Sequence, residues 1–339
     1  MIQDSKEITD QLIAGLSFDE LTIPLFADFS PKIYLIRLDA LRCGTNGRIM
    51  GNKIFKLLPS IQRAKTQKIN RIISFGGPWS NHIHALAAAG DAYNLQTVGI
   101  IRGERKNTLT PTLKDAQQLG MRLQFVSRSD YQRLQDPLMT ATLHQQLGEG
   151  MVVPVGGSNL DGLLGTTEMG KAIVRHLPRD VSDIWLASAT GGTAAGMIAG
   201  ADTEINPLSF RVYNENNNSY KGNVTAVSVL RHCEIAHDIN GFLQQISASK
   251  NENIRERGTV SQPWRVLNEY HCGGYARVNK DLLAFHQQLE KQMAEPVDQV
   301  YMAKLLFALW SQLREGKLNT HKAIAVVHSG GQQGRRGLP

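Results

Sequence analysis

Short apolar runs rich in β-branched residues alternate with segments of helical periodicity along almost the whole chain. Parallel strands need long crossover connections, usually helices, so this alternation predicts a mostly parallel α/β sheet. Nearly continuous apolar strands are typical of sheets that helices cover on both faces. The predicted strands are 33–38, 71–75, 97–101, 121–126, 183–188, 224–230 and 323–327, and the predicted helices are 54–66, 81–94, 110–119, 132–147, 158–176, 193–201, 280–293 and 301–315.

The size and composition of the chain narrow its class further. Its 339 residues are 42% hydrophobic, enough for one large or two ordinary domains. No run reaches the roughly 18 apolar residues of a membrane-spanning helix, and the first residues lack the pattern of a secretory signal. Three widely spaced cysteines, Cys43, Cys233 and Cys272, show neither metal-ligand spacing nor a disulfide framework, so we expect a cytoplasmic protein.

The positive net charge of the chain is compatible with two classes of protein. The net charge is +7 and the sequence pI is about 9.3, values that suit a mildly basic enzyme with anionic ligands or a nucleic-acid binder. Lys and Arg are spread along the chain rather than clustered, which favours the enzyme. The one pair of note, Arg335–Arg336, is expected to be a solvated tail, and the polar stretch 214–219 an exposed loop.

Four glycine-rich loops follow predicted strands or apolar runs. Ligands of parallel α/β sheets bind beyond the carboxyl ends of the strands, and glycine allows the backbone to approach them closely. Each loop also carries hydroxyl or amide side chains, more than turn formation alone requires. The loops are 76–82, 153–159, 189–196 and 328–334.

The loop ATGGTAAG at 189–196 opens a helix directly after a strand. Backbone N–H groups at Gly191 and Gly192, the positive end of the helix dipole, and the hydroxyls of Thr190 and Thr193 would form a phosphate cradle. An ordinary tight turn with a threonine cap explains the same residues. The loop is neither a Walker motif nor a complete dinucleotide fingerprint.

The loop GGPWSNH at 76–82 also ends a strand and starts a helix. Ser80 is a natural N-cap, which is its structural interpretation. In the functional interpretation Ser80, Asn81 and His82 bind an anion such as a substrate carboxylate. The spacing of His82 and His84 does not suit a metal site, so none is expected.

Two lysines lie on the segment GNKIFKLL at 51–58. On a helix, with about 100° per residue, Ile54, Leu57, Leu58, Ile61 and Ala64 share one apolar arc. Lys53 lies at the edge of that arc and Lys56 roughly 60° further out. Lys53 is therefore the better candidate for a desolvated amine with a lowered pKa, which could act as nucleophile or base. The alternative is a lysine that extends from the helix start into solvent.

Three tyrosines complete the candidates. Tyr270 precedes the glycine-rich stretch HCGGYAR (271–277), Tyr275 lies within it, and Tyr301 opens a predicted amphipathic helix. Tyrosine in such places is usually a packing residue with a satisfied hydroxyl.

Taken together, these motifs resemble the pyridoxal-phosphate enzymes of the tryptophan synthase β type, fold type II. More narrowly they resemble the 1-aminocyclopropane-1-carboxylate deaminase / D-cysteine desulfhydrase family. The motifs lie in family order from about residue 35 to 331, and the pairing of GNKxxKL with SNH is their most specific part. The motifs are Arg37-x-Asp39-x-Leu41, Gly51-Asn52-Lys53-x-x-Lys56-Leu57, Ser80-Asn81-His82, Gly156-Gly157-Ser158-Asn159, Ala189-Thr190-Gly191-Gly192-Thr193, Gly274-Tyr275, Pro296, Val300-Tyr301-x-x-Lys304 and His328-Ser329-Gly330-Gly331.

The resemblance implies a fold and roles for the motif residues. The fold would be two open, twisted, mostly parallel sheets flanked by helices, with residues 1–53 and 166–339 in a large cofactor-binding domain and 54–165 in a small one. Lys53 would hold pyridoxal 5'-phosphate covalently and move the Cα proton of a small amino-acid substrate. The resemblance places Lys56 and Thr190–Ala194 at the phosphate, Asn81 at the ring's 3′ oxygen, Ser329 at the ring nitrogen, and Trp79, Ser80, Asn81, His82, Tyr275 and Tyr301 at the substrate.

Two departures from the family pattern bear on the reaction. Met302 stands where the deaminases have an acid and the desulfhydrases a threonine, and Trp79 stands where many relatives have glutamine. Ser329 offers a neutral hydroxyl to the ring nitrogen, which favours the desulfhydrase branch. We therefore expect β-elimination on a D-amino acid, with D-cysteine first. The alternatives are 1-aminocyclopropane-1-carboxylate deamination and a non-catalytic phosphate-ligand binding protein. The resemblance also implies a homodimer, with no nucleic-acid or membrane partner.

Overall fold

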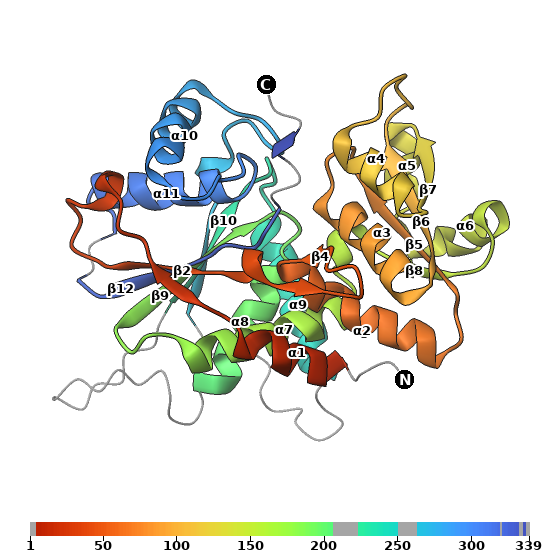
Figure 1. Ribbon diagram of the computed structural model, residues 1–339, viewed down its shortest axis with the longest axis horizontal. Coiled ribbons are helices and arrows are strands. Elements are labelled where there is room, and N and C mark those ends of the chain that lie inside the picture. The colour runs from red at the N-terminus through yellow and green to blue at the C-terminus, as the bar shows by residue number, and fades with distance from the viewer. Residues whose placement is uncertain (1–4, 206–222, 250–262, 319–320, 332–334, 337–339) are drawn as a thin grey trace.

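The computed structural model describes residues 5–205, 223–249, 263–318, 321–331 and 335–336, and contains two separate parallel-rich sheets (Figure 1). The larger has the order β1-β2-β12-β9-β10-β11, antiparallel only between β1 and β2, and the smaller has the fully parallel order β7-β6-β5-β8. This confirms the predicted fold class. The strands are β1 Phe18–Glu20, β2 Ile33–Ile36, β3 Arg42–Cys43, β4 Ile49–Met50, β5 Arg71–Gly76, β6 Gln96–Arg102, β7 Arg122–Val126, β8 Met151–Val153, β9 Val181–Ser188, β10 Asn223–Ser228, β11 Trp264–Leu267 and β12 Ala323–Val327.

Helices cover both faces of the larger sheet because its strands are apolar on both sides. In β9, Ile184 and Leu186 pack into the core toward α7 and α8, whereas Trp185 packs into the opposite core with α11 (Figure 1). The α-helices are α1 Ser5–Ala14, α2 Asn52–Thr66, α3 Asn81–Tyr93, α4 Pro111–Gln118, α5 Arg128–Arg133, α6 Thr140–Leu147, α7 Leu160–His176, α8 Gly192–Ile205, α9 Ile235–Ser249, α10 Lys280–Gln292 and α11 Met302–Arg314. Short 3₁₀ turns are η1 Pro24–Phe26, η2 Leu38–Ala40, η3 Pro137–Met139, η4 Val155–Gly157 and η5 Glu269–His271.

The predicted helix 132–147 is wrong as a single helix. The chain forms α5, the 3₁₀ turn η3 and then α6, because Pro137 has no N–H to donate and Asp136 instead caps the new turn at Leu138 N, 2.9 Å away. The other predicted elements lie within a few residues of their expected ends. The sequence analysis did not predict α1, α9, β1, β8, β11 or the β3–β4 hairpin. The stretch 214–219 lies outside the described residues.

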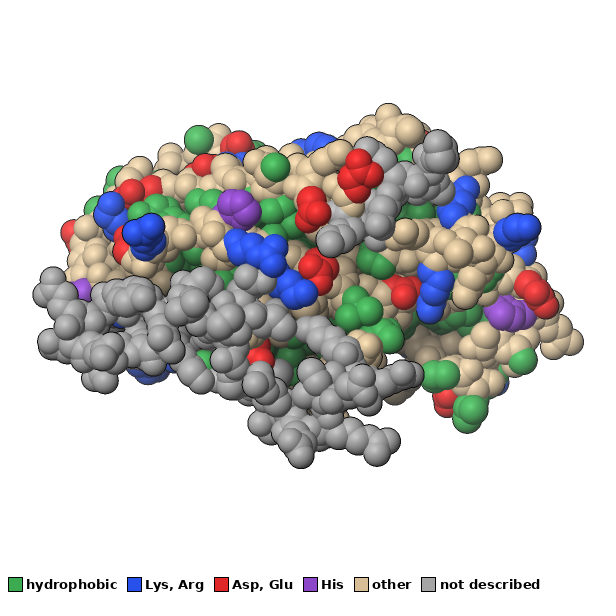
Figure 2. Space-filling view, turned by 90° about the horizontal axis from the view of Figure 1, so that it is seen from below, with side chains coloured by type: hydrophobic (Ala, Val, Ile, Leu, Met, Phe, Trp, Pro, Cys, Tyr) green, Lys and Arg blue, Asp and Glu red, His purple; other side chains and the backbone are tan. Residues whose placement is uncertain are grey.

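The surface shows how charge is distributed. On the face in Figure 2, acidic and basic side chains of the described residues are interspersed, with no continuous basic stripe. Arg336 is exposed and Arg335 partly exposed, as expected of a solvated segment, but both also form surface ion pairs, Arg335 with Glu290 and Arg336 with Asp115 of α4. No helix in the described ranges is both long and apolar enough to span a bilayer.

The start of α2 is fixed by a close backbone approach to the loop after β12. Gly51 precedes the helix with φ 64° and ψ −152°, and a Cβ there would lie 2.2 Å from the carbonyl oxygen of Ser329. Asn52 N donates to that same oxygen at 3.1 Å. Only glycine combines this backbone conformation with this approach.

We predict that Gly51→Ala lowers the free energy of unfolding by more than about 3 kcal/mol, because it adds a steric clash to backbone strain. Gly47→Ala is the matched control: Gly47 has φ 61° with nothing near its absent side chain, so only strain of about 1–2 kcal/mol is expected there. Urea denaturation midpoints measure both. Equal losses in the two variants would contradict the close approach.

Candidate active site

A cavity of about 360 Å³ lies between the two sheets, at the carboxyl ends of their strands. Its wall contains no aspartate or glutamate among the described residues. Of the residues proposed from the sequence, the structure brings to this wall Lys53, Lys56, Ser80, Asn81, His82, Thr190, Gly191, Thr193, Tyr275, Tyr301 and Ser329. Trp79, Gly192 and Ala194 neighbour these residues in the chain but are not part of the wall.

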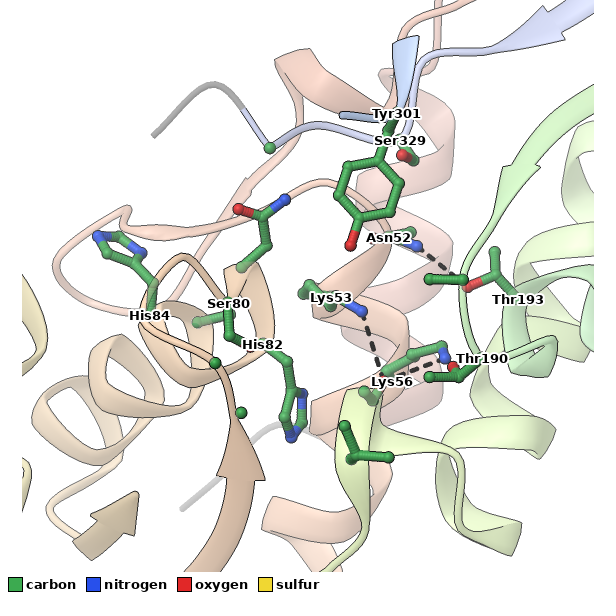
Figure 3. A pocket seen from close by; sticks show the side chains of 18 of the residues that line it. Asn52, Lys53, Lys56, Ser80, His82, His84, Thr190, Thr193, Tyr301 and Ser329 are labelled. Carbon is green, nitrogen blue, oxygen red and sulfur yellow. Dashed lines mark hydrogen bonds between the residues drawn. The ribbon is translucent and has the colours of Figure 1, made fainter. Parts of the chain in front are cut away.

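Lys53 and Lys56 point from α2 toward the same carbonyl oxygen (Figure 3). The Nζ atoms of Lys53 and Lys56 lie 3.4 and 3.1 Å from Gly156 O. Burial lowers the pKa of Lys53 to about 8. Burial, together with the charge of Lys53, lowers the pKa of Lys56 well below its usual value. The described residues place no carboxylate beside either amine, so the pair suits an anionic ligand.

The sequence prediction for Lys56 was wrong in one respect. Lys56 is 1% exposed, and it is Lys53 that borders the cavity more openly. The helical arc considered only the apolar side chains of α2. In the structure α2 packs against α7, and the loop 156–158 covers its Lys56 side.

The loop Gly156–Ser158 is a part of the site that was missing from the predicted site residues. Besides Gly156 O, it supplies Ser158 Oγ, which lies 3.4 Å from Lys56 Nζ and 3.0 Å from Thr190 Oγ1. Gly156 has φ 71°, a conformation that glycine adopts without strain. The signal was present, since this loop was one of the four glycine-rich loops at strand ends.

The N-terminus of α8 faces the two lysines across the cavity. Gly191 has φ 81° and leads directly into the helix at Gly192, so the first N–H groups of α8 are free of intrahelical partners. Thr193 Oγ1 accepts a hydrogen bond from Asn52 Nδ2 at 3.0 Å, which ties the start of α8 to the start of α2. A helix N-terminus beside two buried cations is a site for a phosphate group.

The segment Ser80–His82 lies on the opposite wall and begins α3. Ser80 Oγ caps the helix by accepting from Ile83 N at 3.3 Å, so the structural interpretation of this residue holds. Ser80 also borders the cavity, so its cap role does not remove it from the site. The structure contains no group of three or more potential metal ligands within the described residues.

The proton of His82 can be placed from its neighbours. Ser74 Oγ donates to Val153 O at 2.7 Å, so it accepts from His82 Nε2 at 2.8 Å. His82 Nδ1 then carries a lone pair and has no partner, although it is buried. Burial and the charges of Lys53 and Lys56 lower the pKa of His82 well below its usual value, which keeps the ring neutral.

The site contains a second buried atom without a partner, Asn81 Oδ1. Buried polar side-chain atoms are normally hydrogen-bonded, so two orphans in one cavity wall indicate a ligand with polar groups. Two lysines without an acidic partner, a free helix N-terminus and these atoms together fit a phosphorylated polar ring such as pyridoxal phosphate.

Tyr275 and Tyr301 form an aromatic pair above the lysines. Their ring centroids are 6.2 Å apart with the planes at 74°, and in Figure 3 the Tyr301 hydroxyl and the Lys53 side chain point into the same space. Tyr275 donates to Trp79 O at 3.3 Å. Burial raises the pKa of both phenols, and the neighbouring Tyr275 raises that of Tyr301 further. Both are therefore protonated at neutral pH.

Two buried charges hold these tyrosines in place and were not predicted as site residues. Asp298 caps the start of α11 by accepting from the N–H groups of Val300, Tyr301 and Met302 at 2.7–3.1 Å. Lys304 donates to Gly274 O at 2.6 Å and to His271 O at 2.8 Å, which anchors the loop that carries Tyr275. Met302 is buried in the core beneath α11 and does not border the cavity.

Ser329 is braced by charges behind the cavity wall. Asp39 N donates to His328 O at 3.0 Å, and the Asp39 carboxylate accepts two hydrogen bonds from Arg37 at 2.9 and 3.0 Å. This hydrogen bonding with Asp39 raises the pKa of Arg37 above its already high value. The Arg37–Asp39 motif is thus a brace for the loop after β12.

Known proteins share this architecture. A mitochondrial protein of Arabidopsis thaliana named bifunctional D-cysteine desulfhydrase/1-aminocyclopropane-1-carboxylate deaminase is 26% identical over 305 residues, covering 86% of this chain and 71% of that protein. The crystal structure of an ACC deaminase homologue matches with a TM-score of 0.73 at 20% identity, covering 98% of this chain and 96% of that chain. Serine racemase from Dictyostelium discoideum matches with a TM-score of 0.60 at 14% identity, covering 97% of this chain and 97% of that chain. The sequence model of a family described as pyridoxal-phosphate dependent enzymes matches residues 35–330. That match spans most of the chain, so the protein belongs to the family of pyridoxal-phosphate-dependent enzymes.

Proposed function

We propose that this enzyme is a lyase that carries out β-elimination on a D-amino acid with a leaving group at Cβ, D-cysteine being the first choice. The observation that carries the proposal is the buried Lys53 amine, with its pKa of about 8, facing two protonated tyrosines in one cavity. The name of the Arabidopsis relative supports both the reaction and the D enantiomer.

The residues around the cavity suit the parts of the cofactor. Lys53 would hold pyridoxal phosphate covalently, while Lys56 and the start of α8 at Thr190–Ala194 would hold its phosphate. Asn81 would bond the ring's 3′ oxygen, and Ser329 would lie at the ring nitrogen. When bound, the cofactor withdraws electrons from the substrate's Cα.

The chain's own groups would perform the proton transfers. A lysine with a lowered pKa is a base near neutral pH, so Lys53 would accept the Cα proton. Ser80 and neighbouring N–H groups would bind the substrate carboxylate. Tyr275 and Tyr301, kept protonated by burial, can donate hydrogen bonds to the departing thiolate. The released enamine takes up water, so that D-cysteine yields pyruvate, sulfide and ammonia.

Two other functions remain to be separated by experiment. The first is deamination of 1-aminocyclopropane-1-carboxylate to α-ketobutyrate and ammonia, which the same relative's name includes. The Ser329 hydroxyl at the cavity wall favours elimination, because it offers the ring nitrogen a neutral partner. The second is a non-catalytic phosphate-ligand binding protein, which would need α8 but not a deprotonable lysine facing tyrosines.

We further propose a domain division, an assembly and a location. The separate sheets support a small domain over 54–165 inserted into a large one. The homodimer and the cytoplasmic location rest on family resemblance and on cysteine usage, respectively. Light scattering of the purified protein tests the assembly.

The two lysines are predicted to have separable roles. Lys53→Ala removes the only amine proposed to bond the cofactor covalently. The absorbance band of the covalently bound cofactor is therefore lost. Lys56→Ala keeps the band but weakens cofactor affinity by about tenfold or more, because a charged hydrogen bond to the phosphate is lost. Absorbance titrations with pyridoxal phosphate measure both. A band in Lys53→Ala, or unchanged affinity in Lys56→Ala, would contradict this division.

The lowered pKa of Lys53 predicts a pH dependence. Only the neutral amine attacks the cofactor aldehyde, and its fraction rises as pH passes through the folded pKa. Recombination of the stripped protein with pyridoxal phosphate should therefore accelerate with pH around a midpoint of about 8. Stopped-flow absorbance measures the rate, with Nα-acetyl-lysine as the unburied control. A shared midpoint for the protein and the control would mean that burial does not tune this amine.

Substrate assays separate the candidate reactions. With D-cysteine we expect sulfide, pyruvate and ammonia in equal amounts, and with 1-aminocyclopropane-1-carboxylate little α-ketobutyrate. The L-cysteine reaction controls for the enantiomer, and the Lys53→Ala variant controls for spontaneous sulfide release. α-Ketobutyrate formation that exceeds pyruvate formation would replace the proposed function with the deaminase. Absence of turnover on any D- or L-amino acid would favour the binding protein.

A further inference from the structure

Arginine side chains at the mouth of the cavity have not been assigned to the cofactor or to the substrate's α-carboxylate. A second, more open hollow adjoins the cavity and shares Arg102, Thr190 and Tyr275 with it. Its wall adds Arg231 and Arg277, and we call Arg102, Arg231 and Arg277 the arginine rim.

The rim is assembled from both halves of the molecule. Arg102 ends β6 of the smaller sheet, and its guanidinium carbon lies 5.9 Å from the centre of the Tyr131 ring. Arg231 follows β10 of the larger sheet. A Cβ atom added at Gly274 would lie 3.7 Å from the Cβ of Arg231. A Cβ atom added at Gly273 would lie 3.3 Å from the Cβ of Arg277. The glycine pair before Tyr275 therefore lies against the stems of both arginines.

Acidic side chains do not neutralise the rim. Among the described residues, no carboxylate forms an ion pair with Arg102, Arg231 or Arg277. Asp238 is the only acid in the described wall of the outer hollow, and it lies 2.7 Å from His232 Nε2. Three guanidinium groups around a concave surface focus a positive potential on whatever enters it.

The rim adjoins the tyrosine pair as well as the proposed phosphate end, because the outer hollow is lined by Tyr275 and also by Ser158 and Thr190. Burial raises the pKa of Tyr275, and the positive charge of Arg102 lowers it. The Arg102 guanidinium is therefore close enough to interact electrostatically with the phenol. The phosphate is assigned to Lys56 and α8, and the substrate's α-carboxylate to the Ser80 loop. Both anions are thus assigned to other groups, which leaves the exposed rim available for a further charge on the substrate.

We infer that, among D-amino acids with a leaving group at Cβ, the enzyme prefers to D-cysteine a substrate whose side chain carries a second negative charge, a carboxylate or another oxyanion such as sulfonate or phosphate, which the arginine rim binds. The inference rests on the proposed function, since it names the substrate class of that same site. Guanidinium groups suit oxyanions because they present paired N–H donors in one plane. In β-elimination the bond from Cβ to the leaving group breaks with its electron pair on the leaving group, so a sulfonate on Cβ departs as sulfite and an O-linked phosphate departs as phosphate, toward the rim. A carboxylate bonded directly to Cβ can bind at the rim but cannot leave in this way.

Aspartate and asparagine test the inference without requiring any turnover. They share size and α-carboxylate and differ in the side-chain charge. Each enantiomer is titrated into the cofactor-loaded enzyme, and the shift of the cofactor absorbance band gives its Kd. We expect aspartate to bind at least about tenfold more tightly than asparagine, in the enantiomer that the enzyme accepts.

Rim variants identify the groups responsible. Arg102→Gln, Arg231→Gln and Arg277→Gln should each reduce the aspartate preference severalfold, and their combination should abolish it. Arg179→Gln is the control, because Arg179 is an exposed arginine just before β9. It lies at the amino ends of the strands, whereas the site lies at their carboxyl ends. This variant should keep the wild-type preference. The single variants replace exposed side chains, so they test the rim even where the triple variant does not fold.

The outcomes separate this inference from the proposed function. No shift with aspartate, an aspartate affinity no better than that of asparagine, or a preference unchanged in every rim variant overturns the arginine rim as a binding site. Pyruvate release from D-cysteine without an aspartate preference overturns the rim alone. An aspartate preference that needs the rim, without elimination from any amino acid, supports the rim and overturns the proposed reaction.

Discussion

The rest of the site is arranged around two lysine amines in a buried cavity wall where the described residues place no carboxylate. Removing an ammonium group from water is costly unless it is paired, and a second one beside it adds repulsion. The chain moderates this cost by lowering both pKa values and by aiming both amines at Gly156 O. This arrangement has a use only if an anion enters the cavity. The same desolvation that makes an anion necessary also supplies a neutral amine for covalent chemistry.

The precision of this wall comes from backbone contacts between segments far apart in sequence. Gly51 lies against the carbonyl of Ser329, and that contact sets the direction in which α2 carries Lys53. Asn52 then links α2 to Thr193 of α8. Because strand ends, helix starts and loops are joined in this way, a change at Gly51 would displace Lys53, the start of α8 and the Ser329 hydroxyl together.

Much of the fold and of the site could be predicted because the signals are local. Apolar runs give the strands, and glycine with hydroxyl side chains at strand ends marks the loops around Ser80, Thr190 and Ser329. The burial of Lys56 could not be predicted, because it depends on Gly156–Ser158, some 100 residues away, and on α7. Arg37 and Asp39 were recognised in the sequence only as part of a family motif, and their role in bracing the loop after β12 could not be predicted from it. The break at Pro137 was a local signal that the helical periodicity of 132–147 concealed.

Charge in the site falls into two zones with different structural support. The proposed phosphate end is built from the first turns of α2 and α8, whose geometry is set by helix packing and leaves little freedom to vary. The arginine rim is carried by the ends of strands and by loops, where substitutions disturb the core least. A scaffold divided in this way can keep one cofactor while its rim adapts to different side chains. The loop that Lys304 anchors carries both Tyr275 of the cavity wall and Arg277 of the rim. If the proposed roles hold, one short segment therefore links the group that binds the substrate's side chain to a group beside the reacting atoms.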